Sequence, residues 1–317
     1  MKQKKTHLVV FAVALAALVG LMTLVARTGY GQSQAEEKAS VTPVLKPMAL
    51  VEKRTAAADA SEKKETSLFA EAATRNTLLK YELSWAFGGK QQRGWYLYTP
   101  LISRLLETEG EAAGSDFASS LARWQAATGL QPNGVLDDET LYRMVSTWQG
   151  ARLKNKAYAT PDQLLQAPTS DFYDPTRPDE LRQVERETYA AYKRMLAAAA
   201  ADSSLGLKVT ASGELAPEEK FFKIVSSFRS REHQEQLRAQ SPGSGRAGLA
   251  VNSPHFTGRA LDLYVGGEPV ETKDSNRALQ VQTPAYRWLV RNAERFGFRP
   301  YYYEPWHWEY VGTAAVK

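Results

Sequence analysis

The sequence predicts an α+β domain in the C-terminal half of the chain, preceded by a small all-α domain and an N-terminal transmembrane segment. Three observations lead to this prediction. Residues 260–265 (ALDLYV) alternate small or apolar with polar residues, as strands do. Phe117, Leu121 and Trp124 follow helical spacing. Residues 8–26 contain no charge, and about 20 apolar residues are enough to span a bilayer.

The N-terminal segment, residues 1–31, begins with the basic tip MKQKKTH. The positive-inside rule keeps such a tip in the cytoplasm, so everything after Arg27 is expected to be exported. The apolar run exceeds the usual length of about 7–15 residues in a cleavable signal peptide, although a small-x-small cleavage site is present at 33–35. We expect an uncleaved anchor in the inner membrane with the remainder periplasmic; cleavage would instead give a secreted protein.

Composition excludes several classes of site and partner. Residues 32–77 are rich in Ala, Glu, Lys, Ser and Thr, which predicts a flexible linker. The chain has no cysteine, so disulfides, thiolate metal sites and a lipoprotein anchor are excluded. The net charge of +5 is mild and no DNA- or RNA-binding motif is present, so nucleic acid is not an expected partner.

Residues 78–150 are predicted to form the three-helix domain. The segments 94–106, 117–130 and 139–148 supply its helices, with Gly129 as a C-terminal stop. Asp137 or Asp138 can cap the last helix after the turn QPNG.

Residues 175–317 are predicted to form the α+β domain. A connector containing prolines occupies 151–174, and 177–201 is predicted to be one long helix ending in a run of alanines. The first strands should lie within 207–229, most clearly in FFKIVSSF. We therefore expect a mainly antiparallel sheet with helices on one side.

Two short stretches of this domain, SPHFTGRALD and EPWH, bring histidines and carboxylates together. His255, Asp262 and His307 are the ligand types that zinc accepts in catalytic sites, where a fourth position stays open for water. Glu304 is then free to act as the general base that takes a proton from this water. The alternative is a surface histidine, a solvated aspartate and an aromatic core strand.

The spacing is compatible with one site. A turn at Pro254 and Gly258 would place His255 on a loop that leads into the strand of Asp262. Side chains three residues apart on a regular strand point to opposite faces, so the pair in EPWH needs the kink that Pro305 can supply.

The two stretches resemble the VanY-like zinc D-alanyl-D-alanine carboxypeptidases, a family that shares its fold with lysostaphin-type and hedgehog-type domains. Residues 253–262 match the family pattern S-x-H-x-x-G-x-A-x-D, and 304–307 match E-x-W-H. SSFRS at 226–230 matches S-G-Y-R-S more loosely, because Ser and Phe replace Gly and Tyr. The resemblance covers about residues 197–311.

The resemblance implies a role for each matching residue. The implied zinc ligands are His255, Asp262 and His307. Glu304 is the implied base, and Arg229 would polarise the scissile carbonyl or stabilise its oxyanion, with Arg231 as the competing arginine. Ser253 and Trp306 are candidate substrate-binding residues.

Two neighbours have open roles. Glu309 lies two residues beyond His307 on the same strand face, where it would orient the imidazole as a hydrogen-bond acceptor or form a plain salt bridge. Arg231 and His233 are interpreted as surface or supporting residues at the start of a helix.

The helical domain resembles the three-helix type of peptidoglycan-binding domain, whose typical sequence motif is F-Q-x-x-x-G-L-x-x-x-G-x-x-x-x-x-T. The positions that fit are Trp124, Gln125, Gly129, Leu130, Gly134 and Thr140. The alternative is an ordinary helical packing module.

Together these resemblances imply an exported zinc metallopeptidase, a hydrolase that removes the C-terminal D-amino acid (D-Ala) from peptidoglycan stem peptides. One alternative is an endopeptidase that cuts within stems or crosslinks. The other is a non-catalytic zinc-containing scaffold that binds the cell wall. Glu304 argues against the scaffold, since a structural zinc site is normally closed by a fourth ligand.

Overall fold

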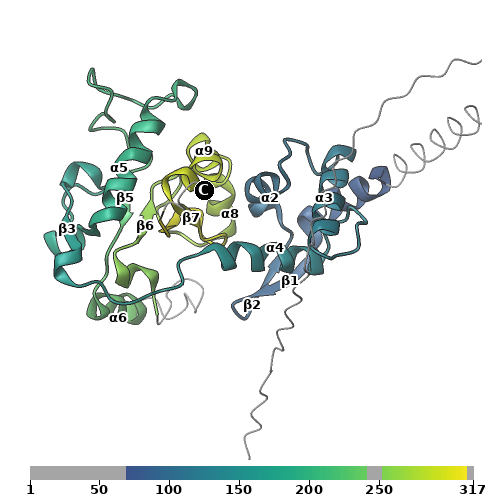
Figure 1. Cartoon of the computed structure of the whole chain (residues 1–317), viewed down its shortest axis with the longest axis horizontal. Coiled ribbons are helices and arrows are strands. Elements are labelled where there is room, and N and C mark those ends of the chain that lie inside the picture. Colours follow the sequence, from purple (N-terminus) through teal and green to yellow (C-terminus); the bar gives the residue numbers. More distant parts are fainter. Residues whose placement is uncertain (1–68, 241–251, 313–317) are drawn as a thin grey trace, which may run out of the picture. The chain divides into compact units, whose positions relative to one another are not determined.

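The computed structural model describes residues 69–240 and 252–312 (Figure 1). The predicted transmembrane segment and most of the predicted linker lie outside these residues. Within the described ranges, no helix is both long and apolar enough to cross a bilayer. All described residues belong to one compact unit, Lys53–Lys317.

The N-terminal part of this unit is helical with one small hairpin. Residues 69–82 form a helix. The elements that follow are β1 (Ser84–Phe87), β2 (Lys90–Arg93), η1 (Tyr96–Tyr98), α2 (Thr99–Leu106), α3 (Ser115–Ala127) and α4 (Asp138–Ala151). The three predicted helices are therefore present as α2, α3 and α4, with Asp137 as the cap whose side chain accepts from the N–H of Thr140.

The all-α prediction for this region is wrong at the antiparallel pair β1–β2. Gly88 and Gly89 connect the strands with φ of 59° and 79°. Two-residue hairpin turns of the type I′ kind need positive φ at both positions, and Gly-Gly supplies it without steric cost. This glycine pair is the sequence signal that predicts the hairpin.

The start of the first helix reaches into the predicted linker. Ala72 and Ala73 are buried, as is Asn76. The Asn76 amide donates to the carbonyl of Gly134 at 2.8 Å, and its oxygen accepts from the N–H of Leu136 at 2.8 Å. These contacts give residues 69–77 an ordered helical structure, which composition alone does not predict.

The C-terminal part contains a four-stranded sheet and its covering helices. The strands of this C-terminal part are β3 (Leu164–Gln166), β4 (Gln183–Glu185), β5 (Ile224–Ser226), β6 (Ala260–Leu263), β7 (Phe298–Pro300) and β8 (His307–Tyr310). Its α-helices are α5 (Arg186–Ala200), α6 (Arg231–Gln240), α8 (Asp274–Gln280) and α9 (Pro284–Asn292). Its 3-10 turns are η2 (Pro161–Gln163), η3 (Thr169–Asp171), η4 (Asp179–Leu181), η5 (Ser203–Leu205), η6 (Pro254–Thr257) and η7 (Ala293–Phe296).

The main sheet has the order β5-β6-β8-β7 with every neighbouring pair antiparallel, as predicted. β3 and β4 form a separate antiparallel pair. This pair corrects the prediction of a long helix over 177–201, because α5 begins only at Arg186. Gln183–Glu185 is a strand, and the Glu185 carboxylate caps the helix by accepting from the N–H groups of Glu187 and Thr188.

The two faces of the main sheet differ in character. In the register of β6 and β8, Leu261 pairs with Trp308 and Asp262 pairs with His307. Successive side chains point to opposite faces, so Leu261 and Trp308 share an apolar face while Asp262, His307 and Glu309 share a polar one. The apolar face belongs to a core cluster that also contains buried residues of α5 and α9.

The same core continues into the helical region. The ring of Tyr302 lies 5.0 Å from that of Phe87, 5.4 Å from Tyr98 and 5.8 Å from Trp148. Aromatic contacts at such distances stabilise a structure beyond their area burial. The segment between β7 and β8 is therefore packed directly against the hairpin, η1 and α4.

Candidate metal centre

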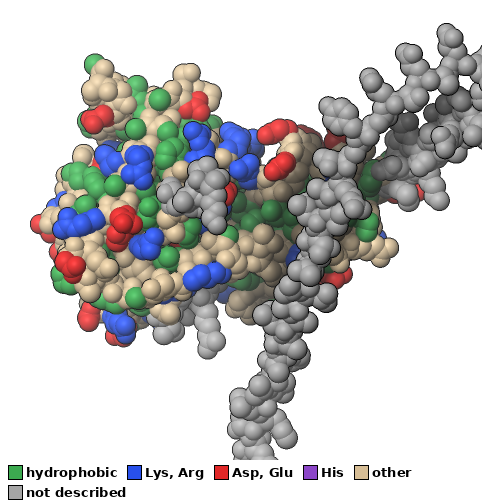
Figure 2. All heavy atoms as spheres, in the orientation of Figure 1, with side chains coloured by type: hydrophobic (Ala, Val, Ile, Leu, Met, Phe, Trp, Pro, Cys, Tyr) green, Lys and Arg blue, Asp and Glu red, His purple; other side chains and the backbone are tan. Residues whose placement is uncertain are grey.

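Two histidines and one aspartate meet on the polar face of the sheet. One ligand atom from each of His255, Asp262 and His307 can be chosen so that all three atoms lie within 4.8 Å of one another. The Asp262 Oδ1 atom is 3.3 Å from His255 Nε2 and 2.9 Å from His307 Nδ1. All three residues are at most 3% exposed. On the face drawn in Figure 2, charged side chains are interspersed and no described histidine is visible.

The second nitrogen of each imidazole has an acceptor. His255 Nδ1 lies 2.6 Å from the carbonyl oxygen of Ser227, and a carbonyl only accepts, so Nδ1 carries the proton. His307 Nε2 lies 3.2 Å from Glu309 Oε1. With both imidazoles neutral, as metal binding requires, donation to these acceptors would leave the lone pairs of His255 Nε2 and His307 Nδ1 free for an ion. Histidine ligands of metals are held in this way, so the donor set fits a metal ion.

Local structure fixes the position of His255. The side chain of Ser253 caps η6 by accepting from the His255 N–H at 3.3 Å. Gly258 ends the turn with φ of 67°, and a Cβ there would lie 2.9 Å from the backbone nitrogen of Glu185. Only glycine fits this close approach, which explains the glycine between the two ligands of the first stretch.

Arg229 is the arginine that reaches the centre. Its Nη2 donates to Asp262 Oδ2 at 2.7 Å, and its Nε donates to Ser226 Oγ at 3.0 Å. Arg231 points elsewhere, with its guanidinium 5.6 Å from the ring centroid of Tyr158. The geometry thus separates the two arginines that the sequence left in competition. His233, on the same helix as Arg231, is not part of the metal-ligand group.

Glu304 lies beside the histidine pair. The segment 301–306 is a turn in which the His307 N–H donates to the Glu304 carbonyl at 3.0 Å. This turn is the kink that the sequence required, and it places Glu304 Oε2 3.9 Å from His307 Nδ1. The Glu304 side chain is buried. Burial raises the pKa of Glu304 to about 8, although the charges of His307 and Arg229 oppose the rise.

The ligand residues have strongly displaced pKa values. Burial, helped by the charge of Arg229, lowers the pKa of His255 to about 4. Burial also disfavours the charged form of His307, but hydrogen bonds to Asp262 and Glu309 outweigh it and raise its pKa to about 9. The pKa of Asp262 lies well below its ordinary value, because His255, His307 and Arg229 together overcome the burial that would raise it. Without a metal, the positive charge of the centre at neutral pH therefore resides on His307 and Arg229.

Glu309 has partners that the sequence did not predict. Its Oε1 accepts from Arg152 Nε at 3.1 Å, and its Oε2 accepts from the Leu153 N–H at 2.9 Å. Burial would raise the pKa of Glu309, but His307 and Arg152 lower it to about 2. Arg152 stands 157 positions away in the sequence, so no local pattern predicts this contact.

The two candidate substrate-binding residues have structural contacts. Ser253 is the cap of η6, as described above. Trp306 is buried in the core, and its carbonyl accepts from the Leu263 N–H at 2.8 Å.

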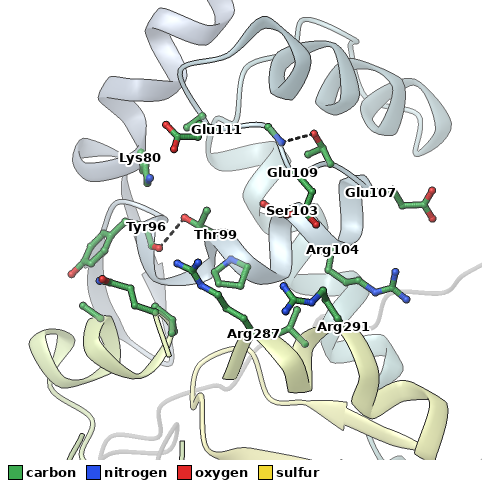
Figure 3. A pocket seen from close by; sticks show the side chains of 18 of the residues that line it. Lys80, Tyr96, Thr99, Ser103, Arg104, Glu107, Glu109, Glu111, Arg287 and Arg291 are labelled. Carbon is green, nitrogen blue, oxygen red and sulfur yellow. Dashed lines mark hydrogen bonds between the residues drawn. The ribbon is translucent and has the colours of Figure 1, made fainter. Parts of the chain in front are cut away.

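A cavity of about 630 Å³ lies elsewhere, lined by α2, the loop after it, and helices α8 and α9. Figure 3 shows Arg287 and Arg291 on the α9 side of this cavity and Glu111 across from them. Among the residues that the structure describes, none of those lining this cavity belongs to the metal centre. The centre is therefore a buried site on the sheet that is separate from this cavity.

One family model matches the segment that contains the site. Residues 181–313 match the family model VanY, D-alanyl-D-alanine carboxypeptidase. Among solved structures, the chain is similar to the LdcB LD-carboxypeptidase, described as revealing the molecular basis of peptidoglycan recognition. The identity is 24%, over 51% of this chain and 73% of that chain, with a TM-score of 0.35. No curated protein matches the chain. The matched segment contains the three motif stretches in order, so residues 181–313 fit a VanY-like peptidase domain.

Proposed function

We propose that the protein is a zinc-dependent carboxypeptidase of the cell envelope that removes the C-terminal D-amino acid, D-Ala, from peptidoglycan stem peptides. The observation that supports this most is the arrangement of His255, Asp262 and His307, each with a second contact that orients it, next to the buried carboxylate of Glu304. A purely structural zinc site would have four protein ligands and no need for that carboxylate.

His255 Nε2, Asp262 and His307 Nδ1 would hold the ion. Bound zinc supplies a Lewis acid and a water whose pKa is near 7. Glu304 accepts a proton from the attacking water and returns it to the leaving amino group as the peptide C–N bond breaks. Burial makes this carboxylate a stronger base than an exposed one, which suits proton transfer near neutral pH.

Arg229 is suited to stabilising the developing oxyanion. A guanidinium has five N–H donors, and Ser226, Gln234 and Asp262 each accept from a different nitrogen of Arg229. Two N–H groups remain for a substrate oxygen. Because its partners fix the side chain in advance, its charge needs no reorganisation during the reaction.

The remaining parts of the chain suggest where this chemistry takes place. We propose that the apolar run at 8–26 anchors the chain and that the described unit lies outside the cytoplasm. The helical region is proposed to bind peptidoglycan on the basis of its motif. In the structure, Gln125 of that motif donates to Val135 O and Thr140 Oγ1 and accepts from the Gly134 N–H, so these motif positions fix the turn before α4.

The test is digestion of purified muropeptides by the protein, followed by mass spectrometry, with and without a chelator. We expect loss of one terminal alanine, abolished by the chelator and restored by zinc. Glu304→Gln should retain zinc and lose turnover by about 10²–10⁴-fold, the usual contribution of a general base. Glu294→Gln, a half-exposed glutamate paired with Arg299, is the matched control and should remain active.

The other outcomes identify the alternatives. Conversion of crosslinked dimers into monomers, without release of a terminal alanine, would assign the protein to the endopeptidases. Absence of product from every muropeptide, with zinc bound at the site, would leave the wall-binding scaffold.

A further inference from the structure

The metal centre has a supporting contact from outside the VanY-like domain. Arg152 immediately follows α4 of the helical region and precedes the start of the family match at residue 181. Its guanidinium binds Glu309 through Nε and Nη2, and the adjacent Leu153 N–H binds the other carboxylate oxygen. Both oxygens of Glu309 are therefore held by two consecutive residues at the end of the helical region.

Arg152 is itself fixed in place from two sides. Its Nη1 donates to Gln149 Oε1 in the last turn of α4 at 2.8 Å. Its guanidinium lies 3.9 Å from the ring centroid of Tyr301, a cation–π contact within the turn that leads to Glu304. The arginine side chain is 15% exposed and the Glu309 side chain is 0% exposed, so this ion pair is shielded from solvent.

The oxygen that Arg152 binds also faces the metal ligand. Glu309 Oε1 is the atom that lies 3.2 Å from His307 Nε2. A carboxylate in this position receives the Nε2 proton and leaves Nδ1 as the metal-binding nitrogen. A rotated or protonated Glu309 would no longer select this tautomer or this ring orientation.

We propose that Arg152 is a positioning residue of the metal centre: it holds Glu309 so that His307 presents Nδ1 toward Asp262 and His255. The end of the helical region thereby completes a site whose ligands all lie in the VanY-like domain. The proposal rests on the metal site of the proposed function and is independent of which peptide bond is cleaved.

The test is zinc affinity, measured on the full chain by competition with a chromophoric chelator. Arg152→Met keeps the aliphatic length of the side chain and removes its charge and donors. We expect zinc affinity to fall about 10–100-fold, the usual cost of losing a contact behind a metal ligand. Arg152→Lys restores the charge without the two-nitrogen contact and should recover part of the loss. Arg295→Met is the matched control, because Arg295 is exposed on η7, where it donates to Asn292 Oδ1 and contacts none of the ligands.

Cobalt(II) provides a second readout that a merely structural role would not change. The visible spectrum of the cobalt-loaded Arg152→Met variant should differ from that of the wild type, while the Arg295→Met spectrum should not. If Arg152→Met fails to fold, the folded Arg152→Lys variant decides, and it must then bind zinc more weakly than the wild type. Wild-type zinc affinity and cobalt spectrum in a folded variant would overturn the proposal. Absence of zinc binding by the wild type would instead overturn the proposed function.

Discussion

The two faces of the four-stranded sheet are built from alternate residues of the same strands, yet they have opposite requirements. On one face Leu261, Leu263 and Trp308 are at most 1% exposed and pack into the apolar core. On the other face Asp262 and His307 are almost as deeply buried, but they are polar and bound to one another. Burial alone therefore does not distinguish core from site.

The difference lies in what satisfies each buried group. An apolar side chain needs only close neighbours, whereas a buried charge is costly unless it is paired and hydrogen-bonded. Asp262 accordingly has a partner at each oxygen, with both histidines at Oδ1 and Arg229 at Oδ2. Substitutions on the apolar face should affect stability in the first place, and those on the polar face should affect metal binding and catalysis.

The largest effect is expected for Asp262→Asn on the polar face. The amide has no negative charge to balance an arginine and a divalent ion, so zinc should be lost and muropeptide hydrolysis should fall at least about 10³-fold. Metal content and product release measure both effects. Asp274→Asn is the control, because that aspartate is 56% exposed at its ion pair with Arg277. A zinc-loaded Asp262→Asn protein would disprove the assignment of this ligand.

Substitutions on the apolar face should lower the stability of the fold. Leu261→Ala deletes a fully buried side chain beside Asp262 and is expected to lower the free energy of unfolding by about 2–5 kcal/mol. The variant molecules that remain folded should still bind as many zinc ions per chain as the wild type. Denaturant unfolding gives the first quantity and metal analysis of the folded protein gives the second. Loss of zinc from folded protein would show that the two faces are not separable.

A smaller effect is expected from pH on the metal-free protein. The folded pKa values of His307 and Glu304, about 9 and about 8, lie above their ordinary values of 6.5 and 4.5. A raised pKa stabilises the fold below the unfolded value, and this contribution is lost as pH rises through the folded value. The unfolding temperature in chelator should therefore fall by a few degrees between pH 6.5 and 9.

This pH dependence should be weaker with zinc bound, because a metal displaces the proton of His307. Glu304→Gln should remove part of the slope. A flat profile for the metal-free wild type would contradict the charge distribution described for the site.

The smallest effect is expected for Ser226→Ala at the edge of the polar face. Its hydroxyl accepts from Arg229 Nε, so the variant should lose about 1 kcal/mol of stability and a few-fold in turnover. Ser227→Ala is the matched control, because Ser227 supports His255 through its backbone carbonyl, which the substitution keeps. Equal losses in both variants would mean that the effect is general to the end of β5 and the residue after it.

Much of the architecture followed from short-range patterns. Helical spacing and caps predicted α3 and α4, and alternation predicted β6. The sequence places the start of α5 nine residues too early, because residues 177–185 contain no strong signal that separates them from the helix. Residues 183–185 are a strand only because they pair with β3. The hairpin β1–β2 was overlooked although its Gly-Gly turn is a local signal.

The sequence by itself determined which side chains are chemically able to form the centre, because SPHFTGRALD and EPWH each place histidine and carboxylate within a few residues of one another. Only the tertiary structure decided which groups orient them. The carbonyl behind His255, the choice of Arg229 over Arg231, and the contact of Arg152 with Glu309 all depend on segments brought together by folding. Such contacts leave no periodic pattern in the sequence, because each joins two segments that are distant in the chain and come together only through the packing of the whole unit.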